Sequence, residues 1–157
     1  MTAKTSAVFD CVVYLQAAAS NGGPSAACMR AVRSGDVQLF VSDLVLAELA
    51  DALWRTSIRR KLPRLTPQVC EEFLCSVREV ATHIEARSLG LRFARDPDDI
   101  PYIELAIQSQ AQFLVTRDAD LLSIPSSTDP DALRIRQLAP NIQIVDPVQF
   151  LAALPTR

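Results

Sequence analysis

The chain has 157 residues, of which 49% are hydrophobic and 22% charged, the balance of a folded globular protein rather than a disordered one. This length can bury one substantial core and does not call for a second domain, so we expect a single domain over residues 1–157. The formal net charge of −2 excludes the overall basic field of non-specific nucleic-acid binders, so any nucleic acid must be held locally.

Short apolar runs alternate with amphipathic segments along the chain. The first half predicts a buried strand that ends near Asp10, a helix over 25–34, a strand over 37–41, and helices over 43–60 and 67–80. The second half predicts a short strand or helix over 89–93, a helix with Pro101 in its first turn, and a strand over 112–116. After these it predicts a loop over 126–140 with a turn at 132–137, a strand over 142–145, and a helix over 147–154. This alternation favours a three-layer α/β/α fold with a central, mainly parallel sheet.

The cysteines and the N-terminal segment indicate the compartment. Residues 1–10 lack the apolar core of a signal peptide, and no apolar run reaches the 18 residues of a membrane span, so we expect a cytoplasmic protein without a membrane segment. Four cysteines without CxxC spacing are typical of reduced core thiols. They are Cys11, Cys28, Cys70 and Cys75.

Two of the predicted strands end in an acid. Asp10 follows the first strand, and Asp118 follows the strand over 112–116. Either residue alone could be a helix cap or a turn former. Because ligand sites in open parallel sheets lie beyond the carboxyl ends of the strands, two acids at that edge favour a functional site.

Glu48 is a third candidate. It lies one helical turn after Leu44 and one turn before Ala52, within the stripe expected to face the core. An ionised carboxylate there is costly without a cation or hydrogen-bond partners. The alternative is a glutamate at the edge of the stripe whose carboxylate reaches solvent.

A run of acids precedes the predicted helix around Tyr102. One acid is explained as a helix N-cap, but Asp96, Asp98 and Asp99 together are not. We therefore place a fourth candidate acid in the pair Asp98–Asp99.

Several carboxylates in close proximity stay ionised at neutral pH only when a cation offsets their repulsion, and oxygen ligands select Mg²⁺ or Mn²⁺. With His83 as the only histidine, zinc sites and Ser-His-Asp or Cys-His catalysis are disfavoured. Four glycines form no phosphate-binding loop. The remaining chemistry is metal-assisted hydrolysis of a phosphodiester.

Basic residues cluster in the segment 55–64. The cluster has two interpretations, a solvated helix end or a patch that contacts RNA phosphates, and charge runs are more often the former. Its members are Arg55, Arg59, Arg60, Lys61 and Arg64.

The order of these signals resembles the PIN-domain family, and within it the VapC-like toxins of bacterial type II toxin-antitoxin systems. The motifs that carry the resemblance are Val8-Phe9-Asp10, Val41-Ser42, Leu46-Ala47-Glu48-Leu49, Arg95-Asp96-Pro97-Asp98-Asp99, Leu114-Val115-Thr116-Arg117-Asp118 and Ile144-Val145-Asp146-Pro147. The resemblance implies a PIN-like fold, an acidic pocket for Mg²⁺ or Mn²⁺, and hydrolysis of RNA. It also implies a homodimer and a cognate antitoxin protein.

Carried over by position, Asp10, Glu48 and Asp118 fall on family acids, and the third family acid falls in Asp98–Asp99. We favour Asp99 because it directly precedes the helix. Asp10, Asp99 and Asp118 would then bind the metal, while Glu48 would help to hold it or orient water. Asp98, Thr116 and Asp120 would support the site through a water or a hydrogen bond.

Two departures from the family pattern are visible. The family commonly follows its first Asp with Thr or Ser and then Asn, whereas Cys11 and Val12 stand here, and Ile100 stands where some relatives have an acid. A metal-dependent endoribonuclease, the toxin of a toxin-antitoxin pair, is the leading hypothesis. The second is a catalytically silent PIN-like module that binds RNA or a protein. A phosphoacceptor receiver-like protein is disfavoured because no suitably placed Lys follows the last strands.

Overall fold

The computed structural model describes residues 4–156, and their central sheet has five parallel strands in the order β3-β2-β1-β4-β5. The strands are β1 (Thr5–Phe9), β2 (Val37–Val41), β3 (Thr82–His83), β4 (Phe113–Val115) and β5 (Gln143–Val145). The helices are α1 (Cys11–Ala19), α2 (Pro24–Arg33), α3 (Asp43–Trp54), α4 (Thr56–Lys61), α5 (Pro67–Val80), α6 (Ile100–Ser109), α7 (Ala119–Ser123), α8 (Pro130–Leu138) and α9 (Pro147–Ala153), with a 3₁₀ helix η1 (Pro97–Asp99).

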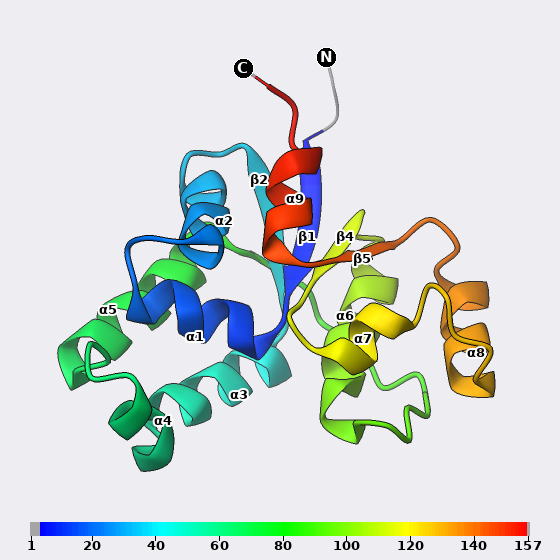
Figure 1. The fold of residues 1–157 in the computed structure, drawn as a ribbon, viewed down its shortest axis with the longest axis horizontal. Coiled ribbons are helices and arrows are strands. Elements are labelled where there is room, and N and C mark those ends of the chain that lie inside the picture. Colours follow the sequence, from blue (N-terminus) through cyan, green and yellow to red (C-terminus); the bar gives the residue numbers. More distant parts are fainter. Residues whose placement is uncertain (1–3, 157) are drawn as a thin grey trace.

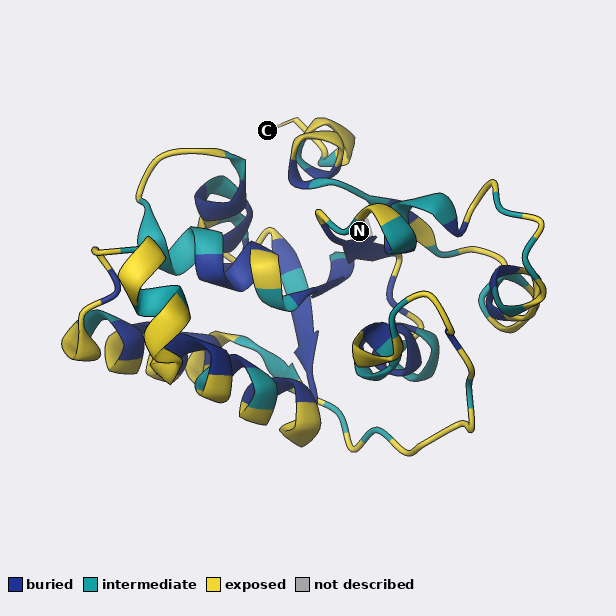
Figure 2. Ribbon diagram, turned by 60° about the horizontal axis from the view of Figure 1, so that its bottom comes forward, coloured by how far each residue is buried: buried dark blue, intermediate teal, exposed yellow. Residues whose placement is uncertain are grey.

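Helices cover both faces of the sheet, which confirms the predicted three-layer fold. Helices α2 and α9 contact each other and lie on one face, and α6 packs against β1, β2 and β4 on the other (Figures 1 and 2). Each pair of neighbouring strands in this sheet is parallel, as expected for strands linked by helical crossovers. No helix of the described residues is long and apolar enough to cross a bilayer.

An aromatic cluster fixes the middle of the sheet. Phe150 of α9 packs edge-on against Phe9 of β1 and Phe113 of β4, with ring centroids 5.9 and 5.2 Å apart, and Tyr14 of α1 lies 5.8 Å from Phe9. These rings are buried, and such contacts add to the free energy gained by removing apolar area from water. They hold the strand ends and α1 in fixed relative positions.

Strands β1 and β4 end level with each other. Phe9 is paired with Val115, so the next residues, Asp10 and Thr116, leave the sheet side by side. The backbone N–H of Asp10 still donates to the Val115 carbonyl at 3.0 Å. The carboxyl edge of the sheet is therefore where the first predicted acid emerges.

Most predicted elements are present, but several boundaries differ. Helix α1 was not predicted. The apolar residues after Asp10 begin it, because the Asp10 side chain accepts from the Val13 N–H at 3.2 Å and so caps the helix. The predicted helix over 43–60 is two helices, since Arg55 between α3 and α4 is extended (φ −70°, ψ 123°).

Two regions were predicted wrongly. Residues 89–93 form neither strand nor helix, and the short strand in this part of the chain is β3, at 82–83. The expected loop over 126–140 contains α8, whose N-terminus is capped by Asp129 with Pro130 in the first turn. Prolines there start a helix, because the first N–H groups of a helix need no intrahelical acceptor.

The cysteines and α3 also correct the sequence interpretation. Cys28 and Cys70 are buried thiols, Cys11 is half-buried, and Cys75 is exposed rather than in the core. Leu44, expected in the inward stripe of α3, is 62% exposed, and the stripe runs instead through Val45, Leu49 and Leu53.

Candidate active site

Asp10 and Thr116 form the buried floor of the site. Asp10 is 3% exposed and Thr116 is fully buried. One carboxylate oxygen of Asp10 accepts from the Val13 N–H, and the other accepts from the Thr116 hydroxyl. Burial raises the pKa of Asp10, these two hydrogen bonds oppose the rise, and the nearby Asp118 charge adds to it.

Thr116 also links Asp10 to Asp118. The Thr116 oxygen accepts from the backbone N–H of Asp118 at 2.9 Å, while its own proton is directed to Asp10. Asp118 then caps α7, because its carboxylate accepts from the Asp120 N–H at 2.8 Å. The two acids predicted from the strand ends thus meet at one edge of the sheet.

Asp99 brings the third carboxylate to this edge. It ends η1, precedes α6 and is 8% exposed, and its Oδ2 atom is buried without a hydrogen-bond partner in the described residues. Burial, followed by repulsion from Asp118, Asp96 and Asp10, raises the pKa of Asp99 to about 8. Ligand oxygens of Asp96, Asp99 and Asp118 lie within 4.8 Å of one another.

A divalent cation fits this arrangement. A buried carboxylate oxygen without a donor is costly, and like charges this close need a proton or a cation between them. The three acids supply only oxygen ligands, which suit Mg²⁺ or Mn²⁺. Together with Asp10, they form an acidic site at the carboxyl ends of β1 and β4.

Glu48 lies half-buried on α3, at the edge of the apolar stripe rather than within it. Burial raises its pKa; the neighbouring Tyr102 hydroxyl and Arg55 act in the opposite direction, whereas the charges of Asp98 and Asp10 add to the rise. Glu48 therefore faces the same acidic region as Asp10 from a separate helix.

The residues predicted to support the site differ in their positions. Thr116 is at its centre, between Asp10 and Asp118. Asp98 is exposed, and its backbone N–H donates to Asp96 at 3.1 Å. The Asp120 carboxylate lies 3.8 Å from Arg95, a long ion pair on the surface side of α7.

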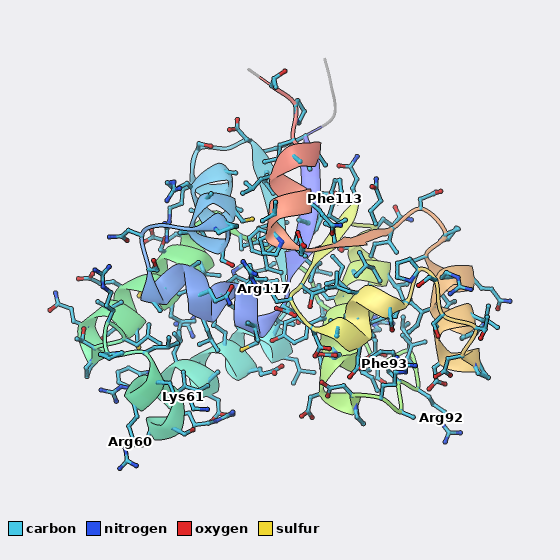
Figure 3. All side chains as sticks on the ribbon, viewed as in Figure 1. Arg60, Lys61, Arg92, Phe93, Phe113 and Arg117 are labelled. Atoms are coloured by element: carbon cyan, nitrogen blue, oxygen red, sulfur yellow. The ribbon has the colours of Figure 1, made fainter. Side chains whose placement is uncertain are left out.

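The predicted RNA-binding residues are not among the acids and lie at the end of α3 and on α4. Arg55 is at the junction of α3 and α4, where it forms an ion pair with Asp51 at 2.7 Å. Arg59, Arg60 and Lys61 follow on α4, and Arg60 projects away from the protein (Figure 3). Of this cluster, Arg55 acts on Glu48, and the cations of α4 follow it along the chain.

The comparison with protein families decides the family. The PIN domain matches residues 6–120, more than half of the chain and the whole of the acidic site. The chain belongs to the PIN-domain family. PIN domains are typically nucleases that use divalent metals, and the acidic cluster of this PIN domain is in keeping with both properties.

A solved structure supports the fold. The crystal structure of PAE2754 from Pyrobaculum aerophilum is similar over 96% of this chain and 95% of that chain, with 20% identity and a TM-score of 0.54. At this identity the likeness concerns the fold alone. No curated protein matches the sequence.

The sequence-based site prediction misses Asp96. It assigns the acid run before α6 to Asp98 and Asp99, but Asp98 points to the surface and Asp96 joins Asp99 and Asp118. The sequence did contain a signal for Asp96, because a helix N-cap explains only one of the three acids in this run. The 3₁₀ turn over 97–99, capped by Asp96, places Asp96 and Asp99 together.

Proposed function

We propose that this PIN domain is a metal-dependent endoribonuclease that hydrolyses RNA phosphodiester bonds. The observation that carries the proposal is the buried, unpartnered carboxylate oxygen of Asp99, which lies among the acids Asp10, Asp96 and Asp118. Two of these acids, Asp10 and Asp99, are buried, and none of the four forms an ion pair within the described residues, so the sheet edge is suited to hold a divalent cation. The PIN domain makes nucleic acid the expected substrate.

The residues have separate roles in this proposal. Asp99 and Asp118, with Asp96 and Asp10, hold Mg²⁺ or Mn²⁺ through their carboxylates. Bound there, the cation would lower the pKa of a water ligand and offset charge on the scissile phosphate. Thr116 fixes the orientation of Asp10 and Asp118 through its two hydrogen bonds.

Glu48 has the environment of a proton acceptor or of a residue that orients the attacking water. Its pKa is raised by burial, which brings a carboxylate closer to the pH at which general bases are most effective. Arg55 lies near enough to Glu48 to oppose this rise, and the α4 cations beyond it are suited to RNA phosphates.

Cleavage of RNA by wild type and by Asp118→Asn tests the proposal. The chain offers a matched control, since Asp129 caps α8 through the N–H of Asp131 just as Asp118 caps α7 through the N–H of Asp120. With Mg²⁺ or Mn²⁺, wild type and Asp129→Asn should cleave RNA and Asp118→Asn should not. Equal cleavage by Asp118→Asn, or by wild type in excess EDTA, would exclude the mechanism.

We further propose that the chain is the toxin of a VapC-like toxin-antitoxin pair, acts as a homodimer and is blocked by a cognate antitoxin protein. The support is the order of the motifs along the sequence. Induced expression in bacteria should stop growth for wild type but not for Asp118→Asn, and the product of a neighbouring reading frame should restore growth. A nuclease that cleaves RNA in vitro but leaves growth unchanged would contradict the toxin role.

Residues 1–157 are proposed as one domain, because β5 and α9 beyond the matched range complete the same sheet and core.

The competing function is a catalytically silent PIN-like module that holds RNA or a protein. It is motivated by the apolar, partly exposed Val12 beside Asp10. Calorimetric titration with Mn²⁺ separates the two functions, since a silent module should bind no metal at millimolar concentration.

A further inference from the structure

Trp54 is the only tryptophan of the chain and lies on the surface. It is the last residue of α3 and is 45% exposed. A single exposed apolar residue is ordinary in a soluble protein and does not by itself indicate a ligand. The basic residues near this indole, however, are a second feature that bears on ligand binding.

The indole is held from one side by an arginine. The Arg59 guanidinium lies over the ring, 5.6 Å from its centroid, and its Nε donates to the Leu65 carbonyl at 3.3 Å. This contact covers one ring face and restrains the side chain. Beside this contact, 45% of Trp54 remains exposed, so part of the indole is open to a ligand.

Three further basic residues follow Trp54 at the end of α3 and on α4. Arg55 follows directly, and its charge is shared with Asp51 at 2.7 Å. Arg60 and Lys61 are exposed and form no ion pair within residues 4–156. An aromatic face among unpaired cations is the combination that binds single-stranded nucleic acid, where bases stack and phosphates pair with basic residues.

The same segment leads to the acidic site. Arg55 directly follows the last residue of α3 and is seven residues after Glu48, which is two helical turns along the same side and about 10 Å of rise. Its charge acts on both Glu48 and Cys11, beside Asp10. The basic residues next to Trp54 therefore begin close to Glu48, at the acidic site.

We propose that Trp54 is a stacking platform for an unpaired base of an RNA strand, whose phosphates pass over Arg55, Arg60 and Lys61. This inference rests on the proposed function and specifies its substrate as RNA with unpaired bases. A second copy of the chain is the less favoured occupant. A two-fold axis near Trp54 would bring two sets of α4 cations together at a cost in free energy.

The single indole reports directly on the proposed contact. Wild type is titrated with a single-stranded RNA dodecamer in EDTA, where the proposed cleavage cannot proceed, and tryptophan emission is followed. We expect quenching by the single strand, and much less by the same RNA as a duplex or by inorganic polyphosphate. Equal quenching by polyphosphate would show a charge effect alone and overturn the proposal.

Variants measure the contribution of the ring. Binding of labelled dodecamer, followed by anisotropy in EDTA, should weaken about 5- to 100-fold in Trp54→Ala, the range expected for the loss of one base–aromatic stack. Trp54→Phe should recover most of the affinity. Leu133→Ala, at a 42% exposed apolar site on α8, is the matched control and should bind like wild type.

The remaining outcomes are distinct. Affinity in Trp54→Ala equal to wild type would refute the stacking platform, as would a dimer in sedimentation that Trp54→Ala dissolves. Thermal melting followed by circular dichroism identifies a variant that fails to fold. If Trp54→Ala does not fold, the RNA affinity of Trp54→Phe is compared with that of wild type instead. Quenching in EDTA with no cleavage in Mg²⁺ or Mn²⁺ would leave the platform in place and refute the nuclease instead.

Discussion

Asp99→Asn isolates the buried acid on which the proposed metal site depends. Asparagine has nearly the same shape as aspartate but no charge, so the variant removes ionisation while retaining the packing of a residue that is 8% exposed. In wild type, the pKa of Asp99 is raised from 3.8 to about 8, first by burial and then by the neighbouring acids. The folded protein therefore binds this proton more tightly than the unfolded chain.

The sign and size of the effect follow from this difference. A raised carboxyl pKa contributes stability that is fully present below about 3.8 and is lost as the pH rises towards about 8. Each pH unit within this window removes up to about 1.36 kcal/mol, so the interval from pH 6 to pH 8 removes up to about 2.7 kcal/mol. For a domain of this size, that corresponds to a fall in Tm of about 5–10 °C without metal.

A divalent cation should replace the proton and reverse this loss. At a concentration about 100 times its Kd, a ligand that binds only the folded state stabilises it by about 2.7 kcal/mol. Asp99→Asn should show a flatter fall in Tm between pH 6 and pH 8 and little gain from Mg²⁺ or Mn²⁺. Some slope should remain, because the pKa values of Asp10 and Glu48 are also raised.

Thermal melts followed by circular dichroism, with and without cation at matched ionic strength, provide the assay. Asp98→Asn is the control, since Asp98 is adjacent in sequence but exposed. The reasoning is refuted if Asp99→Asn keeps the pH dependence and the metal stabilisation of wild type.

Three further predictions concern the surroundings of the site. Thr116→Val removes the donor to Asp10 and should cost about 1–3 kcal/mol, measured by denaturant unfolding; an unchanged free energy of unfolding would contradict the assigned hydrogen bonds. Asp96→Asn should weaken Mn²⁺ binding in calorimetry while Asp98→Asn does not, and equal affinities would place the ligand set elsewhere. Replacing Arg60 and Lys61 together with Ala should reduce the slope of log affinity for single-stranded RNA against log salt by about 0.7 for each phosphate that is no longer neutralised, whereas an unchanged slope would show that α4 is only a solvated helix end.

The sheet was predictable because its signals are local. Buried parallel strands have short apolar runs, and Ser, Thr or Asp at an N-cap marks where a helix begins, as Ser42 does for α3. The failures lie where one local pattern fits two structures. The apolar residues 11–13 continue the composition of β1, and only the Asp10 cap in the folded chain makes them a helix.

The site was predictable in part for the same reason. Asp10 and Asp118 follow strand ends, so the parallel register alone brings them to one edge. The choice among Asp96, Asp98 and Asp99 depends on the rotation of a 3₁₀ turn, which no periodicity of the sequence encodes. The exposure of Leu44 shows the same limit, since the inward stripe of α3 is set by what packs against it.

The unusual residues after Asp10 bear on whether the site is complete. Cys11 and Val12 replace the polar residues that the family commonly has there, yet Asp10 does not lack support. Its two carboxylate oxygens accept from the Val13 N–H and from the hydroxyl of Thr116, which directly follows the neighbouring strand β4. The polar partner that orients Asp10 is therefore supplied across the sheet, and the chain retains, without a polar residue at position 12, the fixed carboxylate that the proposed reaction requires.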